Sequence, residues 1–286
     1  MLPGPLHFTQ EESVLVLLFS LLACSTQDVD TAPSGDTGSP TGTLHPLEAS
    51  EDIREVVLVN MMTGQLAYGA LLYVQQNAGE PDLCPLVEET GPGTWSVEGC
   101  SDPELGVDFE GSYTVSGFEW GEAGFAPGNV EVIWDDFTTT ITKGPGGAWG
   151  RQVYDGTASF ELFEDSLGGG SFDLTFVSEG FACEVVAAGG VSERIWTISN
   201  LERSSLWTDG TDEVSGTIEV GGVGAVSLAG TIGWDYAACS SEPVDGTLTL
   251  VGEPTLTLEF DGATTCDGRS SYGGDLEGDV IWGLSG

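Results

Sequence analysis

The sequence predicts a mainly β protein, in which an antiparallel sheet (a sandwich or a curved, partly closed barrel) is preceded by one α-helix. Three observations predict this class. The 286 residues include 43 glycines, and Thr, Ser, Val and aromatic residues are frequent, which is typical of turn-rich β proteins. Apolar residues follow helical spacing in a single stretch, Ser50 to Gln76. From Leu83 onward apolar and polar residues alternate, with short turns and no intervening helix.

The first element, residues 1–23, is expected to be an export signal. Val14 to Ala23 is an apolar run that is too short to span a bilayer as a helix and has the length of a secretory signal core. It ends in Leu21-Leu22-Ala23-Cys24, which resembles the lipobox of bacterial lipoprotein signal peptides.

The lipobox resemblance implies a location. In such lipoproteins a diacylglycerol is joined to the cysteine thiol, here Cys24, and cleavage leaves that cysteine as the new N-terminus. Two or more acyl chains, palmitate among them, then hold the protein stably on a membrane. Ser25 follows the cysteine, and a residue other than Asp there implies the outer membrane. We therefore expect a lipid-anchored outer-membrane lipoprotein, on either the periplasmic or the cell-surface face.

The next two segments are expected to be a tether and a helix. Residues 24–46 are rich in Gly, Pro, Ser, Thr and Asp and bury too little apolar surface to fold, which predicts a disordered tether. Residues 47–82 are expected to hold a helix packed on the sheet, with acidic residues in its first turn and with Gly79 and Pro81 ending it. Val56 to Val74 carries no charge, which also fits a membrane span, but polar residues and glycines interrupt it, so a core helix is favoured.

Residues 83–286 are expected to form the antiparallel β body. The residues expected to face inward are Phe109, Gly111, Tyr113, Val115, Gly117, Val130, Val132, Trp134, Phe172, Leu174, Phe176, Ile218, Val220, Leu256, Leu258, Phe260, Leu276, Val280 and Trp282. Turns are expected at residues 121–128, 144–147, 168–170 and 221–224, where glycines cluster.

The six cysteines suit an exported protein. With Cys24 lipidated, we favour disulfides Cys84–Cys100 and Cys239–Cys266 and a buried, free Cys183, while Cys183–Cys239 stays open as an alternative. No metal site is expected from these cysteines, because none is closely paired and no histidine follows His45.

The chain is strongly acidic, with 46 acidic and 6 basic residues and a net charge of -40. This charge argues against nucleic acid and against electrostatic docking on anionic lipid, and it favours basic partners or divalent cations. A solvated acidic surface explains it equally simply, and we favour that interpretation. The alternative is a Ca²⁺ site on one face of the sheet, formed by the outward-facing Glu131, Asp173, Glu219, Glu259 and Glu277.

Several catalytic chemistries are missing from the sequence. The two histidines, His7 and His45, precede the β body, so it holds no Ser-His-Asp or Cys-His arrangement. No nucleophile elbow or phosphate-binding loop occurs, and Lys143 is the one lysine. We therefore expect no catalytic residues and no cofactor.

Tryptophans beside carboxylates suggest the alternative of a carbohydrate-active protein. The two suggestive stretches are Glu119-Trp120-Gly121-Glu122 and Trp134-Asp135-Asp136. Trp134, Trp196 and Trp282 are expected in the core, and Trp207 is expected to be exposed in a turn. A glycoside hydrolase would need two carboxyl groups about 5–9.5 Å apart across an aromatic groove; glycan binding is the more conservative form of this alternative.

The sequence as a whole favours a non-catalytic binding or structural role at the bacterial envelope. The expected partners are the membrane, through the N-terminal lipid, and a basic protein or a glycan. No nucleic-acid partner is expected.

Overall fold

The computed structural model describes residues 50–103, 106–119, 126–141, 150–163, 167–180, 193–206, 210–221, 224–235, 237–239 and 242–282. These residues form the helix α2 (Ser50–Asn77) and one 14-stranded antiparallel sheet. The strands are β1 (Leu86–Gly91), β2 (Thr94–Glu98), β3 (Ser101–Asp102), β4 (Val107–Ser116), β5 (Gly128–Ile141), β6 (Gly150–Leu162), β7 (Leu167–Gly180), β8 (Glu193–Arg203), β9 (Gly210–Val220), β10 (Gly224–Trp234), β11 (Thr247–Val251), β12 (Thr255–Glu259), β13 (Arg269–Gly274) and β14 (Gly278–Ile281).

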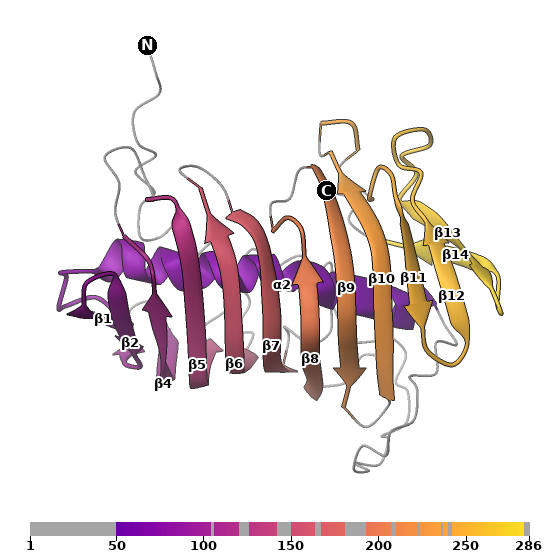
Figure 1. Cartoon of the computed structure of the whole chain (residues 1–286). Helices are drawn as coiled ribbons and strands as arrows, with labels where there is room; N and C mark the ends of the chain where they lie inside the picture. The colour runs from indigo at the N-terminus through magenta and orange to yellow at the C-terminus, as the bar shows by residue number, and fades with distance from the viewer. Residues whose placement is uncertain are drawn as a thin grey trace.

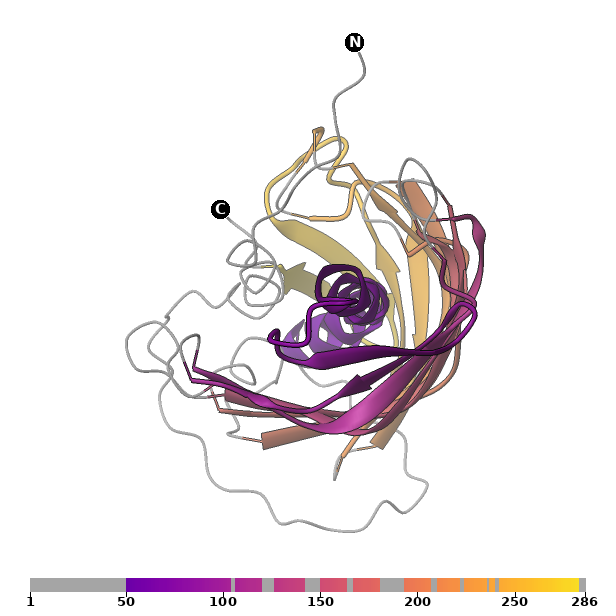
Figure 2. The ribbon, with the colours of Figure 1, turned by 90° about the vertical axis from the view of Figure 1, so that its left-hand side faces the viewer.

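The sheet is a meander, in which neighbours in the sheet are neighbours in the chain (Figure 1). The one departure is the short β3, which pairs with β4 beside the main path. The sheet curves around α2 and stays open, with β1 and β14 as its two ends (Figure 2). The predicted class, a mainly β antiparallel fold preceded by one helix, is confirmed, and the sheet takes the curved form rather than the sandwich.

Helix α2 lies inside the curve of the sheet and is buried on almost every side. Its bounds match the expected stretch to within one residue. The helix ends where the Ala78 amide donates to the Val74 carbonyl oxygen at 3.1 Å and Gly79 takes a φ of +82°, the conformation that ends many helices. By length and composition, Asp52–Asn77 is apolar enough to cross a membrane. Here the sheet covers it, as expected for a helix that is apolar all round.

The inward faces of the strands are largely as expected. Trp134, Trp196 and Trp282 are 5%, 0% and 1% exposed, and the other apolar residues expected to face inward on β5, β7, β9 and β12 are buried with them. One apolar residue was placed wrongly: Leu276 is 42% exposed, because it lies in the turn between β13 and β14 rather than on the inner face.

The prediction of which residues face inward was least accurate for the glycines. Gly111 and Gly117 are exposed and have φ values of +72° and +76°, and Gly111 lies where the β4–β5 register shifts, as in a β-bulge. The turn expected at residues 168–170 is wrong, because these glycines belong to β7. A Cβ on Gly170 would lie 2.8 Å from the Cβ of Phe160. Glycine is therefore required there for close packing rather than for a turn.

Hydrogen bonds fasten α2 to the sheet along its length. Two come from the indole of Trp196 and the phenol of Tyr113, which donate to Glu55 Oε1 at 2.7 Å and to the Ala70 carbonyl oxygen at 3.0 Å. At the C-terminal end of the helix, Asn77 Nδ2 donates to the Pro85 carbonyl oxygen at 2.7 Å. These bonds satisfy polar groups that would otherwise be costly to bury.

A buried arginine, Arg203, connects the sheet to the middle of α2. Arg203 Nη1 donates to the Asn60 carbonyl oxygen at 3.1 Å and to Thr63 Oγ1 at 3.2 Å. Its Nε lies 2.7 Å from Asp212 Oδ2, and the two side chains are 6% and 5% exposed. Arg203 therefore joins the end of β8, strand β9 and the middle of α2.

The two disulfides join the cysteine pairs that the sequence analysis favoured. Cys84 is bonded to Cys100, and Cys239 is bonded to Cys266. Since Cys239 is already paired, the alternative Cys183–Cys239 is not formed. Cys24, the tether and Cys183 itself lie outside the described residues.

Candidate functional site

An aromatic pocket lies between α2 and the inner faces of β4, β5 and β6. Its lining residues come from the second half of the helix and from three adjacent strands. They are Leu66, Gly69, Ala70, Tyr73, Val107, Phe109, Tyr113, Trp134, Phe137, Thr139, Ile141, Gln152 and Tyr154. Six of them carry aromatic rings, and none of these described lining residues is charged at neutral pH.

The rings contact one another closely. Tyr113 meets Phe137 edge-on with ring centroids 4.8 Å apart, and Tyr73 meets Phe109 edge-on at 5.5 Å. Edge-to-face contacts at these separations are favourable for aromatic pairs. The walls of the pocket are therefore preformed rather than assembled by a ligand.

Two polar side chains among the strand residues give the pocket a polar corner. Gln152 on β6 is only 4% exposed, and its Oε1 accepts a 2.6 Å hydrogen bond from the Tyr154 hydroxyl. Thr139 on β5 is the register partner of Gln152. A bound molecule can thus meet amide and hydroxyl groups at one side and rings elsewhere, the usual composition of small-molecule sites.

The tyrosines of the pocket stay neutral. Burial raises the pKa of Tyr73 above the ordinary value for a phenol. Burial, followed by the proximity of Tyr73, raises the pKa values of Tyr113 and Tyr154. Their hydroxyls therefore act only as hydrogen-bonding groups, and the pocket has no phenolate to serve as a base or an anion.

The size of the pocket limits its occupant. Its volume is about 50 Å³, several times the roughly 10–15 Å³ that one water needs. A ring or a short alkyl segment fits this space, whereas an entire lipid does not. The low polarity of the walls favours an apolar group over a bound ion.

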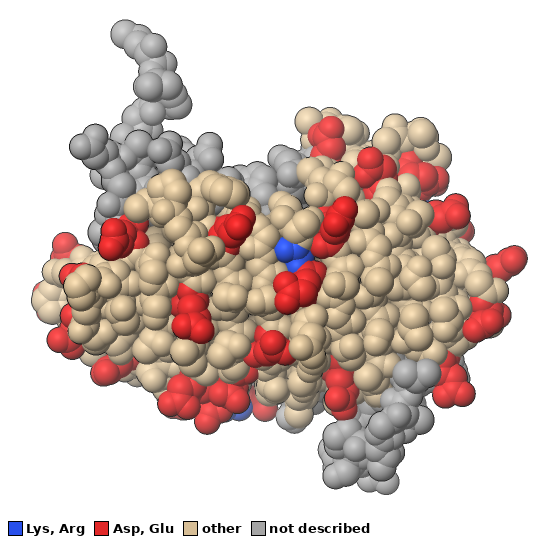
Figure 3. Space-filling view, in the orientation of Figure 1, with Lys and Arg blue, Asp and Glu red and all other residues tan. Residues whose placement is uncertain are grey.

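The outward-facing acids do not come together. Glu131 and Asp173 lie on β5 and β7, so β6 separates them; two strand spacings amount to about 10 Å. Glu219 and Glu259 lie farther along the sheet, on β9 and β12, and Glu277 follows β13. Figure 3 shows acidic side chains scattered over the outer face of the sheet instead of gathered at one point.

A single group in the described part of the chain has metal-ligand spacing, namely Cys239, Glu242 and Cys266. Its two sulfur atoms are joined in a disulfide, which removes the thiolates that a metal would need. The expected alternative of a Ca²⁺ site made by the outward acids therefore has no counterpart among these residues.

The tryptophans considered as sugar platforms do not provide one where they are described. Trp134 is buried and forms part of the pocket wall, whereas Asp135 and Asp136 beside it are exposed. Trp120, Gly121, Glu122 and Trp207 lie outside the described residues, and so does Lys143.

Sequence reasoning missed the pocket, although one signal pointed to it. In β6, Gln152 and Tyr154 occupy the same inward-facing register as Ala158 and Phe160. A glutamine on an otherwise apolar face marks a place where the core accommodates a polar group. Which helix residues meet it depends on the packing of α2 against the sheet, which alternation alone does not reveal.

Comparison with protein-family models, with curated proteins and with solved structures found no match for this chain.

Proposed function

We propose that this protein is a lipid-anchored lipoprotein of the bacterial outer membrane that binds a small apolar ligand in its aromatic pocket and does not transform it. The observation that carries the binding role is the pocket itself, an accessible space between α2 and β4–β6 walled by six aromatic rings. Enzymatic turnover would require a nucleophile, an acid or a base. The described lining supplies neutral phenols, an amide and a hydroxyl.

The ligand class follows from the chemistry of the walls. Aromatic and aliphatic surfaces favour a ring or an alkyl group, and the corner formed by Gln152 and Thr139 favours one hydrogen-bonding substituent on it. A sugar, with hydroxyls on every edge, would leave most of them without partners against these walls.

Phenol, a single ring with one hydrogen-bonding substituent, tests the pocket by isothermal titration calorimetry. Wild-type protein should give a saturable heat of binding with phenol, and Ala70→Phe should abolish it because the new ring occupies the pocket that Ala70 lines. The matched control is Ala229→Phe, which adds the same ring at an exposed position of β10.

Equal binding of phenol by both variants would contradict the pocket assignment. Thermal unfolding of both variants shows whether Ala70→Phe is folded, and the smaller Ala70→Leu provides a milder filling of the same space. Titration with soluble oligosaccharides is the second arm. Binding of a glycan that survives Ala70→Phe would support the carbohydrate-binding alternative instead.

The proposed lipid anchor is supported by two features of the sequence. Leu21-Leu22-Ala23-Cys24 resembles a lipobox, and residues 24–46 have the composition of a tether. We expect Cys24→Ala to release the protein from the membrane fraction, since a chain without its acyl groups loses its hold on the bilayer. Cys183→Ala is the matched control and should leave the protein in that fraction. Identical fractionation of the two variants would refute lipidation at Cys24.

A further inference from the structure

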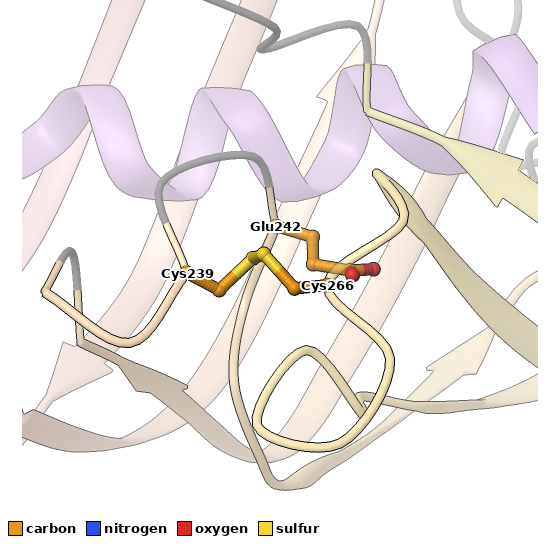
Figure 4. A group of neighbouring side chains, drawn as sticks. All are labelled: Cys239, Glu242 and Cys266. Carbon is orange, nitrogen blue, oxygen red and sulfur yellow. A yellow bond between two sulfur atoms is a disulfide. The ribbon is translucent and has the colours of Figure 1, made fainter.

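The Cys239–Cys266 disulfide has a buried carboxyl group beside it (Figure 4). A carboxylate oxygen of Glu242 and the two sulfur atoms all lie within 4.8 Å of one another. Glu242 and Cys239 belong to the segment between β10 and β11, and Cys266 to the segment between β12 and β13. This cluster is separate from the aromatic pocket and does not depend on it.

Glu242 is held in place through one of its two oxygens. Its Oε1 accepts hydrogen bonds from the backbone amides of Asp267 at 2.8 Å and Gly268 at 3.3 Å. The side chain is 0% exposed, and Oε2 has no hydrogen-bond partner among the described residues. A buried oxygen without a donor is costly when it is charged and acceptable when it carries a proton.

The surroundings of Glu242 raise its pKa. Burial raises its pKa above the usual range, and the nearby carboxylates of Asp267 and Asp261 raise it further, against the lowering effect of the two backbone amides. The group is thus able to hold a proton under conditions in which an exposed glutamate has lost it.

The two cysteines differ in their exposure to solvent. Cys239 is 2% exposed, whereas Cys266 is an exposed residue. Cys266 also has a φ of +44°, a left-handed conformation that residues other than glycine seldom adopt and that often marks functional positions. An incoming thiolate can therefore reach Cys266, while Cys239 is the leaving group that faces the protein interior.

We propose that Cys239 and Cys266 form a thiol–disulfide exchange site for dithiol partners, in which Glu242 donates a proton to Cys239 on reduction and removes it on reoxidation. A carboxyl group beside the buried sulfur of an exchanging pair supplies the proton that a thiolate leaving group needs in a dry environment.

A partner dithiol reduces the Cys239–Cys266 disulfide in two steps. A thiolate of the partner attacks the Cys266 sulfur, the bond between Cys266 and Cys239 breaks, and Cys239 leaves with the electron pair and takes the proton of Glu242. The second thiolate of the partner then attacks the partner's own sulfur in the mixed disulfide and expels Cys266, which is protonated from water. The partner dithiol is oxidised by two electrons, the protein disulfide is reduced, and Glu242 regains its proton from solvent.

The other disulfide provides an internal comparison. Cys84 and Cys100 are both half-buried, and within the described residues no carboxylate forms a close group with them. Their exchange with a dithiol should therefore lack both the accessible sulfur and the proton donor.

The test is reduction of the full folded protein by dithiothreitol near neutral pH, with timed trapping by iodoacetamide and mass spectrometry of each cysteine. We expect Cys239–Cys266 to open about tenfold or more faster than Cys84–Cys100. Glu242→Gln should slow the first disulfide by about tenfold and leave the second unchanged. The glutamine oxygen can still accept both backbone hydrogen bonds, so the variant removes the proton while keeping the shape.

Glu259→Gln, on the exposed face of β12, is the matched control and should leave both rates unchanged. Equal rates for the two disulfides in wild-type protein would overturn the proposal. So would an unchanged rate in Glu242→Gln, or faster reduction of both disulfides in that variant, because the carboxyl group would then serve only to hold the two segments together.

Discussion

Arg203 is a buried cation whose partners come from two elements, strand β9 and helix α2. Its charge is offset by Asp212 at 2.7 Å, and its Nη1 donates to the Asn60 carbonyl oxygen and Thr63 Oγ1 of the helix. Desolvating such a pair is expensive, so its net effect on stability is small while both partners remain. Losing one partner is different, because the other charge then stays buried without compensation.

Replacing a buried and an exposed aspartate should therefore have different effects on stability. Asp212→Asn should lower the free energy of unfolding by about 3–5 kcal/mol, since Arg203 is left buried without a counter-charge. Asp279→Asn should cost less than about 1 kcal/mol, because Asp279 and Arg269 are 57% and 55% exposed and 3.9 Å apart. Urea unfolding measures both, and similar losses would show that the Arg203–Asp212 pair is no better shielded than the surface pair.

The raised pKa of Glu242 makes the stability of the protein depend on pH. Because its pKa is raised above 4.5 in the folded protein, the folded state keeps a proton that the unfolded state releases as the pH rises. Its contribution to stability is therefore fully present below pH 4.5 and is lost as the pH rises through the folded value. The free energy of unfolding of wild type should fall relative to that of Glu242→Gln across this window. A difference that is constant with pH would contradict the raised pKa.

At the level of elements, the approach of α2 to the end of β8 is set by a glycine. A Cβ on Gly64 would lie 2.8 Å from the Leu206 carbonyl oxygen and 3.3 Å from Arg203 Nη1. The helix can lie this close to the sheet only because residue 64 has no side chain. The same closeness lets Arg203 reach the carbonyl oxygens in the middle of the helix.

This packing reverses the usual effect of alanine in a helix. Gly64→Ala should destabilise the protein by about 1–3 kcal/mol through overpacking, although alanine normally stabilises a helix by about 1 kcal/mol relative to glycine. Gly273→Ala is the control, because a Cβ there meets nothing within 4 Å. Thermal unfolding of the two variants measures the contrast. A stabilised Gly64→Ala would mean that α2 moves away from the sheet at no cost.

The elements themselves were predictable, and their contacts were not. Alternation along Phe172, Leu174 and Phe176 identifies a strand with one buried face, and helical spacing identifies α2 to within a residue, because both periods are local properties of the chain. Ala70 of the helix and Gln152 of β6 line the same pocket, and this arrangement depends on how the sheet curves. Glu242 stands in Ser-Ser-Glu-Pro, which suggests an exposed turn, and it is buried because residues 266–268 fold over it.

For the whole molecule, charge is the dominant property. A net charge of -40 sets like charges against one another across the outer face of the sheet (Figure 3). Such self-repulsion opposes the compact state, and salt reduces it by shortening the screening length.

Stability should accordingly rise with ionic strength. Raising the salt from about 0.01 M to about 1 M shortens the screening length from about 30 Å to about 3 Å. The midpoint of thermal unfolding should increase over this range, with NaCl and KCl giving the same result because screening does not distinguish them. A midpoint that falls, or that responds to one cation alone, would indicate specific ion binding instead of screening.

The order of the chain has a consequence for how the molecule matures. Among the described elements, synthesis delivers α2 before the sheet and β14 after the other strands, and β14 is among the strands that pack against α2. The apolar surface of the nascent helix therefore stays exposed while the hairpins of the sheet are synthesised one after another. The nascent chain is most prone to aggregation during this interval. It therefore depends on chaperones that bind apolar segments until the last hairpin has been synthesised.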